Sequence, residues 1–376
     1  MPRSYPTLLI AILAAGGWYF SKNPGKLHEF IAAISQRQNT IGQTAPGGYF
    51  PTSNPYPTGS YPANSYPTNS VPTYPSQQPA APVQTTYNGQ PPAPAAPPTP
   101  AFGGPTIRIA TFNIQIFGDK KASKPYVMAT LANIIQNFQV VAIQEIRTQD
   151  NYFIDEFLRT YVNANGRKYD KVVGPRLGRT NSKEQYAFIY DTAAIEVNPR
   201  CIFTVNDPDD LLQREPFVAM FRVRGPPAQQ AFTFVLIDMH TEPDDTTSEL
   251  NALGQVYQAV RRACGGEDDI ILLGDLNVDD QHLGDLGRID GVIPIVRHTY
   301  TNTRQNAQYD NIIIHQPSTT EFTGRWGVFN VEQLYHLTRD QALEVSDHFP
   351  VWAEFNAYES TTPGRVAARG TGVLTQ

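Results

Sequence analysis

Apolar runs of seven to nine residues alternate with polar stretches from residue 106 onwards. Runs of this length, rich in Val, Ile and Phe, are typical of strands in sheets that are covered on their faces. The predicted strands cover residues 107–114, 140–146, 185–191, 217–223, 232–240, 269–277, 309–315 and 349–355. Amphipathic stretches predict helices at 124–138, 150–163 and 245–264. Many strands with few helices favour an α+β fold, in which two packed sheets are flanked by helices.

The chain before residue 106 lacks this alternation. Residues 7–20 form an apolar run of 14 residues behind Arg3, whereas a membrane-spanning helix needs about 20 apolar residues. The short length favours the core of a signal peptide, and the aromatic end at 18–20 favours an interfacial membrane anchor. A buried helix of a soluble protein is the third alternative. We predict that residues 1–40 are a signal peptide or membrane anchor with its following segment.

Residues 41–104 contain the pentads YPTGS, YPANS and YPTNS, followed by the run PPAPAAPPTP. Such a segment cannot bury enough apolar surface to offset the entropy lost on folding. We predict a disordered, partly polyproline-II linker, with a docking or glycosylation stalk as the alternative. The chain therefore divides into residues 1–40, this linker at 41–104, a globular domain at 105–357 and a flexible tail at 358–376.

The formal charge is unevenly distributed. The whole chain carries −6, residues 1–40 carry +3, and residues 41–104 contain no Asp, Glu, Lys or Arg. The remaining residues, 105–376, therefore carry −9. A domain this acidic does not hold a polyanion by bulk attraction. A nucleic-acid substrate would need a bound cation and a few well-placed arginines.

Polar side chains stand where the predicted strands end or begin. Each is able to bind a hard cation or to move a proton. They are Asn113 near the end of the first strand, Glu145 in the second, His240 in the fifth, Asp275 and Asn277 in the sixth, Tyr309 and Asp310 at the start of the seventh, and Ser346, Asp347 and His348 before the last. A single acid there is usually a cap or turn residue. Six such strand ends together favour one functional rim.

The types of these residues predict the chemistry of that rim. Oxygen donors suit Mg²⁺, Mn²⁺ or Ca²⁺, and two histidines near such a cation suit general acid–base catalysis. Each histidine needs a carboxylate to fix its tautomer, and Glu184 and Asp310 are available for that role. The set fits hydrolysis of a phosphate ester, in which one group activates water and another protonates the leaving alkoxide.

The globular domain resembles pancreatic-type deoxyribonuclease I, within the endonuclease/exonuclease/phosphatase superfamily. The resemblance rests on the segments FNIQIFG, AIQEIR, PRLGRTNSKEQY, the REP at 214–216, DMHTEP, LLGDLN, YDNIII and SDHFPV, in this order from Arg108 to Phe355. It implies a four-layered α/β/β/α sandwich of two packed, mainly antiparallel sheets with outer helices. It also implies a catalytic domain at 105–357, a metal-dependent endonuclease that cuts double-stranded DNA to 5′-phosphate products with little sequence specificity.

The resemblance further implies a role for individual residues. The expected cofactor is Mg²⁺, for which Mn²⁺ can substitute, and its expected ligands are Glu145, Asp347, Asn113, Asp275 and Asn277. His240 is expected to pair with Glu184, and His348 with Asp310; which histidine is the base stays open, as does the choice between one and two metals. The expected DNA contacts are Arg147, Arg214, Arg179 and Tyr309. We expect a monomer.

Some family features are missing. Gln115 and Ser182 stand where the family commonly has a phosphate-binding arginine and a deoxyribose-packing tyrosine. Ala307 and Asp280 replace the cysteines of the larger family disulfide, and the smaller one is not reproduced either. The TYTNTRQN segment at 299–306 keeps the threonines of the calcium loop but lacks its acid, so Ca²⁺ is only partly supported. The two cysteines, Cys201 and Cys264, could form one disulfide or none.

Two other functions stay open. A lipid phosphodiesterase or inositol-phosphate phosphatase of the same superfamily would share the metal and histidine residues, and a non-catalytic surface-binding module would have lost some of them. Arg147, Arg214 and the segment LGR-x(3)-KE-x-Y favour the nuclease. We expect the domain outside the cytoplasm, either secreted or tethered to the membrane by the N-terminal segment.

Overall fold

The computed structural model describes residues 106–179, 183–264 and 266–359. The expectations for residues 1–40, for the linker at 41–104 and for Ser182 lie outside these residues, as does the tail from residue 360 onwards. No helix within the described ranges is both long and apolar enough to cross a membrane.

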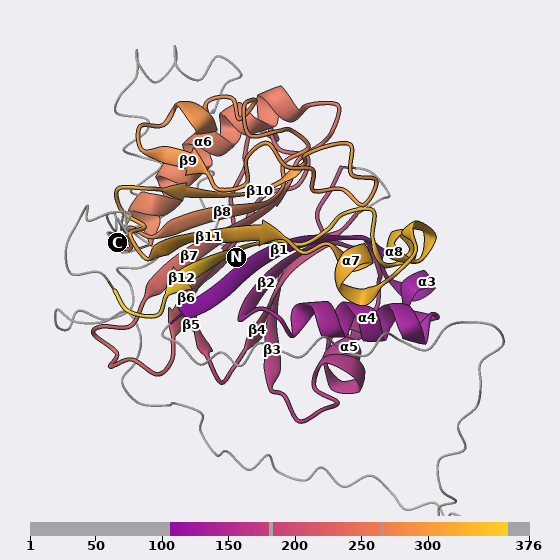
Figure 1. Cartoon of the computed structure of the whole chain (residues 1–376). Coiled ribbons are helices and arrows are strands. Elements are labelled where there is room, and N and C mark those ends of the chain that lie inside the picture. Colours follow the sequence, from indigo (N-terminus) through magenta and orange to yellow (C-terminus); the bar gives the residue numbers. More distant parts are fainter. Residues whose placement is uncertain (1–105, 180–182, 265, 360–376) are drawn as a thin grey trace, which may run out of the picture.

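Two six-stranded sheets pack face to face (Figure 1). The first has the strand order β11-β12-β1-β2-β4-β3, with bounds Phe322–Val328, Val351–Asn356, Thr106–Phe117, Val140–Ile146, Gln185–Asp191 and Tyr169–Val173. The second has the order β5-β6-β7-β8-β10-β9, with bounds Ile195–Thr204, Phe217–Val223, Thr233–His240, Ile270–Asp275, Asp310–His315 and Val292–Pro294. Buried side chains from both sheets fill the space between them, among them the stacked rings of Phe188 and Phe217.

Each sheet contains one parallel pair of strands, β1 with β2 and β7 with β8, and all other neighbours are antiparallel. A parallel pair needs a crossover connection. The helix α4 (Pro125–Ile135) lies in the first crossover, and α6 (Thr246–Ala263) forms the second. Asn113 near the end of β1 contacts Asp275 at the end of β8, so β1, β2, β7 and β8 all run toward the same end of the sandwich, which we call the rim.

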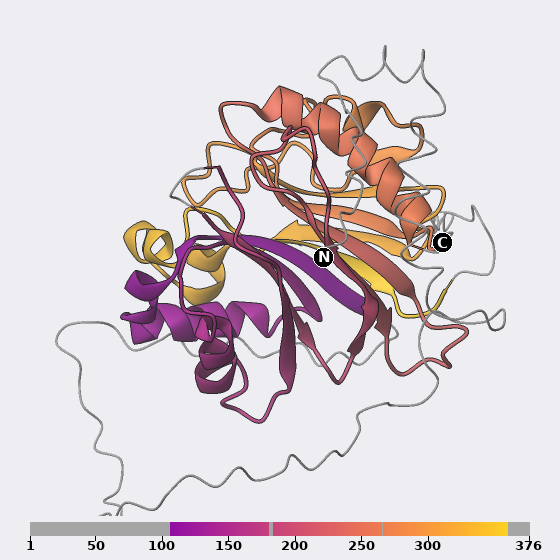
Figure 2. The same cartoon turned by 180° about the vertical axis from the view of Figure 1, so that it is seen from behind.

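Helices cover the outer faces of both sheets, as Figures 1 and 2 show from opposite sides. Apolar side chains of α6 pack on the second sheet, and those of α4 pack on the first. The shorter helices are α3 (Asp119–Ala122), α5 (Phe153–Phe157), the π-helix η1 (Leu158–Val162), the 3₁₀-helix η2 (Leu286–Arg288), α7 (Val331–Tyr335) and α8 (Arg339–Val345). This arrangement confirms the predicted α/β/β/α sandwich.

Two local expectations differ from the structure. The stretch 150–163 is not one α-helix, because α5 passes directly into the π-helix η1. The strands β3, β5, β9 and β11 were not predicted. All four lie at sheet edges, where one side has no neighbour and the residues are partly exposed, so they lack a continuous apolar run.

The two ends of the sandwich domain lie together, far from the rim. Thr106 at the start of β1 pairs with Asn356 at the end of β12. Backbone pairing continues beyond β12. Tyr358 forms a β-bridge with Ala231, and the backbone N–H of Glu359 donates to the carbonyl of Gln230 at 2.9 Å. Backbone pairing at this end therefore includes Tyr358 and Glu359, the last two described residues.

Candidate active site

Strand direction gathers the predicted polar residues at the rim. The strands β1, β2, β7 and β8 run toward it, and they bring Asn113, Glu145, His240 and Asp275. The strands β4, β10 and β12 are antiparallel to these neighbours, so they start at the rim. Glu184, Asp310 and His348 accordingly lie at or just before their first residues.

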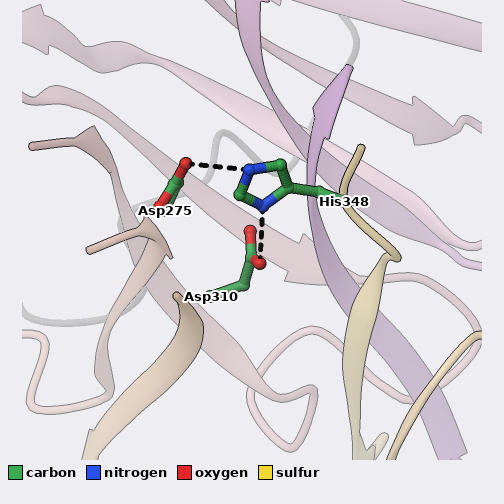
Figure 3. A group of neighbouring side chains, drawn as sticks. All are labelled: Asp275, Asp310 and His348. Atoms are coloured by element: carbon green, nitrogen blue, oxygen red, sulfur yellow. Dashed lines mark hydrogen bonds and ion pairs between the residues drawn. The ribbon is translucent and has the colours of Figure 1, made fainter. Parts of the chain in front are cut away.

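Asp275 is at the centre of this group. Its Oδ2 lies 3.6 Å from Nε2 of His240 and 3.5 Å from Nε2 of His348. The same oxygen accepts a hydrogen bond from the amide of Asn113 at 2.9 Å. Figure 3 shows the ring of His348 with Asp275 on one side and Asp310 on the other. Two imidazoles thus point at one carboxylate oxygen.

A buried carboxylate supports each histidine at its other nitrogen. Nδ1 of His240 is 2.8 Å from Glu184, and Nδ1 of His348 is 2.8 Å from Asp310. Burial alone would lower the pKa of each imidazole, but the neighbouring carboxylates outweigh it. The pKa of His240 is raised, and that of His348 is raised to about 10. These carboxylates favour the imidazolium form and hold each Nε2 toward Asp275.

Two arginines surround Glu184. Arg147 lies 3.4 Å from Glu184 and 3.2 Å from Glu145, and a quarter of its side chain is exposed. Arg214 lies 3.5 Å from Glu184, but its side chain is only 6% exposed. Its guanidinium donates to the carbonyl oxygens of His240 and Thr241, both at 3.1 Å. Arg214 therefore positions the His240 segment, and contact with a DNA phosphate would require it to leave these bonds.

A threonine loop supports Asp310. The hydroxyl of Thr301 donates to Asp310 at 2.7 Å, and that of Thr303 donates to the carbonyl of Ser346 at 2.7 Å. These threonines belong to the segment 299–306, which the sequence associated with a calcium loop. Their hydroxyl groups hold Asp310 and the turn that carries His348.

Glu145 has a left-handed backbone with φ of 63°. The pairing registers of β1 with β2 and of β2 with β4 both shift beside it, as they do at a β-bulge. A non-glycine residue held in this region costs roughly 1–3 kcal/mol and is frequent at functional sites. Its carboxylate accepts from the backbone N–H of Ile116 at 2.9 Å and from the Asn113 amide at 3.3 Å. The bulge therefore aims Glu145 at Asn113.

Asp347 and Gln115 complete this side of the rim. The amide of Gln115 donates to Asp347 at 2.7 Å, so the residue in the place of the family arginine is bonded to an expected metal ligand. Ser346 donates to the carbonyl of Asn113 at 2.7 Å and accepts from the N–H of His348 at 3.1 Å. Burial, and next to it the charge of Glu145, raises the pKa of Asp347, although His348 acts in the opposite direction.

The oxygens at the rim fit a hard divalent cation. The side-chain oxygen Oδ1 of Asn113 is buried and has no hydrogen-bond partner within the described chain. It belongs to a residue bonded to both Glu145 and Asp275. Asp275, Asp310 and His348 also offer ligand atoms within 4.8 Å of one another. An amide oxygen beside several carboxylates is a typical ligand set for Mg²⁺ or Mn²⁺.

The remaining expected site residues have different surroundings. Asn277 has φ of 51°, and its amide donates to the carbonyl of Thr241 at 2.9 Å. The ring of Tyr309 lies 5.8 Å from that of His348. Arg179 pairs with Asp210 at 2.9 Å and donates to the carbonyl of Leu212 at 3.1 Å. Its bonds are to that loop and to none of the histidines or carboxylates at the rim.

Sequence reasoning missed two residues that position the site. The hydroxyl of Tyr186 accepts from the backbone N–H of His240 at 3.0 Å. Lys121 in α3 is only 8% exposed and donates to the carbonyl oxygens of Glu344 and Val345, just before Ser346. Burial lowers the pKa of Lys121 to about 8. Tyr186 belongs to the segment LGR-x(3)-KE-x-Y, which carries the family resemblance but gives the tyrosine no role, and Lys121 is a lysine in a polar stretch that no pattern marks.

The chain is similar in sequence to a known family and to characterised proteins. The sequence profile of the Endonuclease/Exonuclease/phosphatase family matches residues 110–348. Deoxyribonuclease gamma of Rattus norvegicus is 30% identical over 280 residues, which are 70% of this chain and 89% of the relative. Deoxyribonuclease-1-like 1 of Sus scrofa is 32% identical over 272 residues, 68% of this chain and 83% of the relative. The solved structure of truncated Caenorhabditis elegans TDP2 aligns with a TM-score of 0.47 at 15% identity, over 67% of this chain and 98% of that one.

Proposed function

The chain belongs to the endonuclease/exonuclease/phosphatase family and is a hydrolase of the deoxyribonuclease I type, and we propose that it cuts double-stranded DNA in a reaction that depends on Mg²⁺ or Mn²⁺. One observation carries this proposal: both histidines direct Nε2 to within 3.6 Å of a single oxygen of Asp275. The names of the relatives support DNA as the substrate.

The two histidines handle the protons. One Nε2 takes a proton from the attacking water, and the other gives a proton to the leaving 3′ oxygen, which leaves a 5′-phosphate on the other fragment. Glu184 and Asp310 stabilise the imidazolium form through which each histidine passes. Asn113 and Asp275 hold the two imidazole rings in fixed positions relative to each other, and so relative to the reacting phosphate.

Glu145, Asn113, Asp347 and Asp275 would hold the cation, with Asn277 bonded to the Asp275 carboxylate through its backbone N–H at 3.0 Å. A bound Mg²⁺ or Mn²⁺ supplies positive charge that stabilises the phosphorane-like transition state. Arg147 is the partly exposed guanidinium beside these ligands, so it is suited to contact the DNA backbone or groove. This local charge offsets the acidity of the domain.

Removing divalent cations is expected to abolish cleavage of supercoiled plasmid by the full chain. The reason is that the clustered carboxylates repel a phosphate unless a cation neutralises them. Plasmid nicking is measured in Mg²⁺, in Mn²⁺ and in excess EDTA, and ligation of the products tests for 5′-phosphates. The Glu145→Gln variant serves as the control and should be inactive in all three conditions. Undiminished cleavage in EDTA would contradict the metal mechanism, and hydrolysis of sphingomyelin instead of plasmid would favour the lipid phosphodiesterase.

We also propose that the domain works outside the cytoplasm, secreted or tethered by residues 1–40. The two cysteines of the chain, both free thiols in this structure, provide a test of this location. Cys201 in β5 and Cys264 at the end of α6 are buried, and their sulfurs are 3.3 Å apart. A disulfide has a sulfur–sulfur bond of about 2.05 Å, so a small shift would close it. An oxidised protein disulfide of that compartment would take up the two electrons and two protons.

Full-length protein from the extracytoplasmic fraction is therefore expected to contain this disulfide. The sample is denatured without reductant, alkylated and weighed by mass spectrometry, and we expect no alkylation of either cysteine. A reduced aliquot is the control and should be alkylated at both. Full-length protein found in the cytosolic fraction alone would contradict the proposed location, and two free thiols in the exported protein would contradict the disulfide.

A further inference from the structure

A polar pair lies in the otherwise mainly apolar interior between the two sheets, just below the rim. Gln144 in β2 immediately precedes Glu145, and Asp238 in β7 is two residues before His240. The amide of Gln144 donates to Oδ1 of Asp238 at 2.5 Å and to the hydroxyl oxygen of Thr111 in β1 at 2.9 Å. All three side chains are fully buried. The pair therefore joins the two sheets next to the candidate active site.

This pair lacks one hydrogen-bond donor. The NH₂ group of Gln144 already has two acceptors, whereas its oxygen Oε1 accepts no hydrogen bond from the residues that the structure describes. The same holds for Oδ2 of Asp238. An ionised carboxylate can only accept, but a protonated one carries an O–H donor. One proton on Asp238 would therefore supply the donor that Gln144 needs.

The surroundings of Asp238 favour the neutral acid. Its neighbours in β6 and β8 are Phe217 and Leu273, which are apolar. Burial raises the pKa of Asp238 well above its ordinary value, and the negative charge of Glu184 adds to this effect. The bond from Gln144 and the backbone N–H of Met239 act against it.

The other titratable groups on this side of the interior come from β4 and the segment before it. Burial raises the pKa of Tyr186 in β4, so its hydroxyl is neutral. Arg214 lies 3.5 Å from Glu184 and compensates that carboxylate. A charged Asp238 would thus be buried beside a second acid, which is costly unless a proton neutralises it.

We propose that Asp238 is a neutral carboxylic acid in the folded protein, and that it donates its proton to Oε1 of Gln144. The two side chains then exchange two hydrogen bonds, one from the amide N–H to Oδ1 and one from the carboxyl O–H to Oε1. Such a pair satisfies both buried groups without burying a charge.

Asp238 and Gln144 are then positioning residues for the rim. Gln144 fixes β2 one residue before the left-handed Glu145, and Asp238 fixes β7 two residues before His240. An expected metal ligand in one sheet is thereby held at a constant separation from a catalytic histidine in the other. This effect on catalysis rests on the proposed function, whereas the protonation of Asp238 does not.

The Asp238→Asn variant tests the protonation, because an asparagine amide donates and accepts as the neutral acid does. Infrared difference spectra of the full chain, wild type minus Asp238→Asn, are recorded at neutral pH. We expect the wild type to show an additional carboxylic acid C=O band. Asp244→Asn is the matched control, since it removes an exposed acid, and its difference spectrum should show carboxylate bands. Carboxylate bands from Asp238 would overturn the proposal.

The pH dependence of unfolding gives a second measurement. An acid whose folded pKa is raised stabilises the protein fully below its unfolded pKa, of about 4, and this stability is lost as the pH rises toward the folded pKa. The unfolding constant of the wild type should therefore increase relative to that of Asp238→Asn by roughly tenfold per pH unit above that value. Urea unfolding of both proteins measures the ratio. A ratio that stays constant with pH would contradict a neutral Asp238.

Plasmid cleavage tests the positioning role. Asp238→Asn should keep kcat within about threefold of the wild type, whereas Asp238→Ala and the nearly isosteric Gln144→Met should each lower kcat roughly 10–100-fold. KM should be unchanged, because neither side chain is exposed to DNA. Leu236→Ala is the matched control, a fully buried truncation in the same strand that should lower stability but not kcat.

Equal kcat in Asp238→Ala, Gln144→Met and Leu236→Ala would overturn the positioning role. A wild type that cuts no DNA would instead refute the proposed function, and with it any role of the pair in cleavage. The infrared spectra and the unfolding ratio would still decide whether Asp238 holds the proton, so the two failures are distinguishable.

Discussion

Replacing His240 or His348 with alanine is expected to lower kcat for plasmid cleavage by at least about 10²-fold, the usual loss when a general acid or base is removed. Each ring has one nitrogen on a buried carboxylate and the other near Asp275. Because the two histidines serve one reaction, the double variant should lose far less than the product of the two single losses.

The two variants should differ in their free energy of unfolding. After loss of His240, Glu184 keeps its ion pairs with Arg147 and Arg214. After loss of His348, Asp310 keeps the Thr301 hydroxyl but has no cationic partner among the described residues. His348→Ala should therefore lower the free energy of unfolding more than His240→Ala does. Single-turnover rates and urea unfolding are measured in parallel, with the exposed His282→Ala as the control. If one of the variants kept most of its activity, the histidine that it lacks would have only a structural role.

Replacing Gly274 with alanine is expected to destabilise the domain by about 2–6 kcal/mol. Gly274 has φ of 151°, and a Cβ built on it would lie 1.8 Å from the carbonyl oxygen of Met239. Backbone strain costs roughly 1–3 kcal/mol, and overpacking typically adds 1–3 kcal/mol. The neighbouring backbone is part of β7, so it cannot move without shifting His240 away from Asp275.

Urea unfolding of the full chain measures this effect. Gly225→Ala is the matched control, since Gly225 has φ of 108° but nothing within 4 Å of its built Cβ. The control therefore reports the backbone cost alone. If Gly274→Ala lost no more stability than Gly225→Ala, the close approach of β7 and β8 would not limit packing at the rim. We also expect the surviving folded Gly274→Ala protein to lose activity.

The inner strands could be predicted from the sequence because both of their faces are buried, so each strand is a nearly continuous run of apolar residues. The strand β2, for example, has the predicted bounds Val140–Ile146 and is buried at all but one position. The edge strand β11, by contrast, has a partly exposed pattern around Gly324 and Arg325 that a local reading cannot separate from a loop. The π-helix after α5 has no distinct apolar period either.

The types of the rim residues could be predicted, but their arrangement could not. That Asp275 pairs in register with both His240 and Asp310 follows from the order of β7, β8 and β10 in the sheet, which no single strand encodes. The role of Thr301 was hidden because its segment also fits a calcium loop. The bonds of Arg214 to backbone carbonyls arise only after folding, so sequence similarity alone assigned it to DNA.

The pairing of Thr106 with Asn356 has a practical consequence for handling the enzyme. Both junctions of the sandwich with the rest of the chain lie at the end that carries no candidate catalytic side chain. A bead, a surface or a fused protein attached through either junction would meet that end, and the rim would face outward. Duplex DNA is long and stiff, so it cannot enter the narrow space between an immobilised domain and its support. In this orientation the rim faces away from the support, and the DNA can reach it.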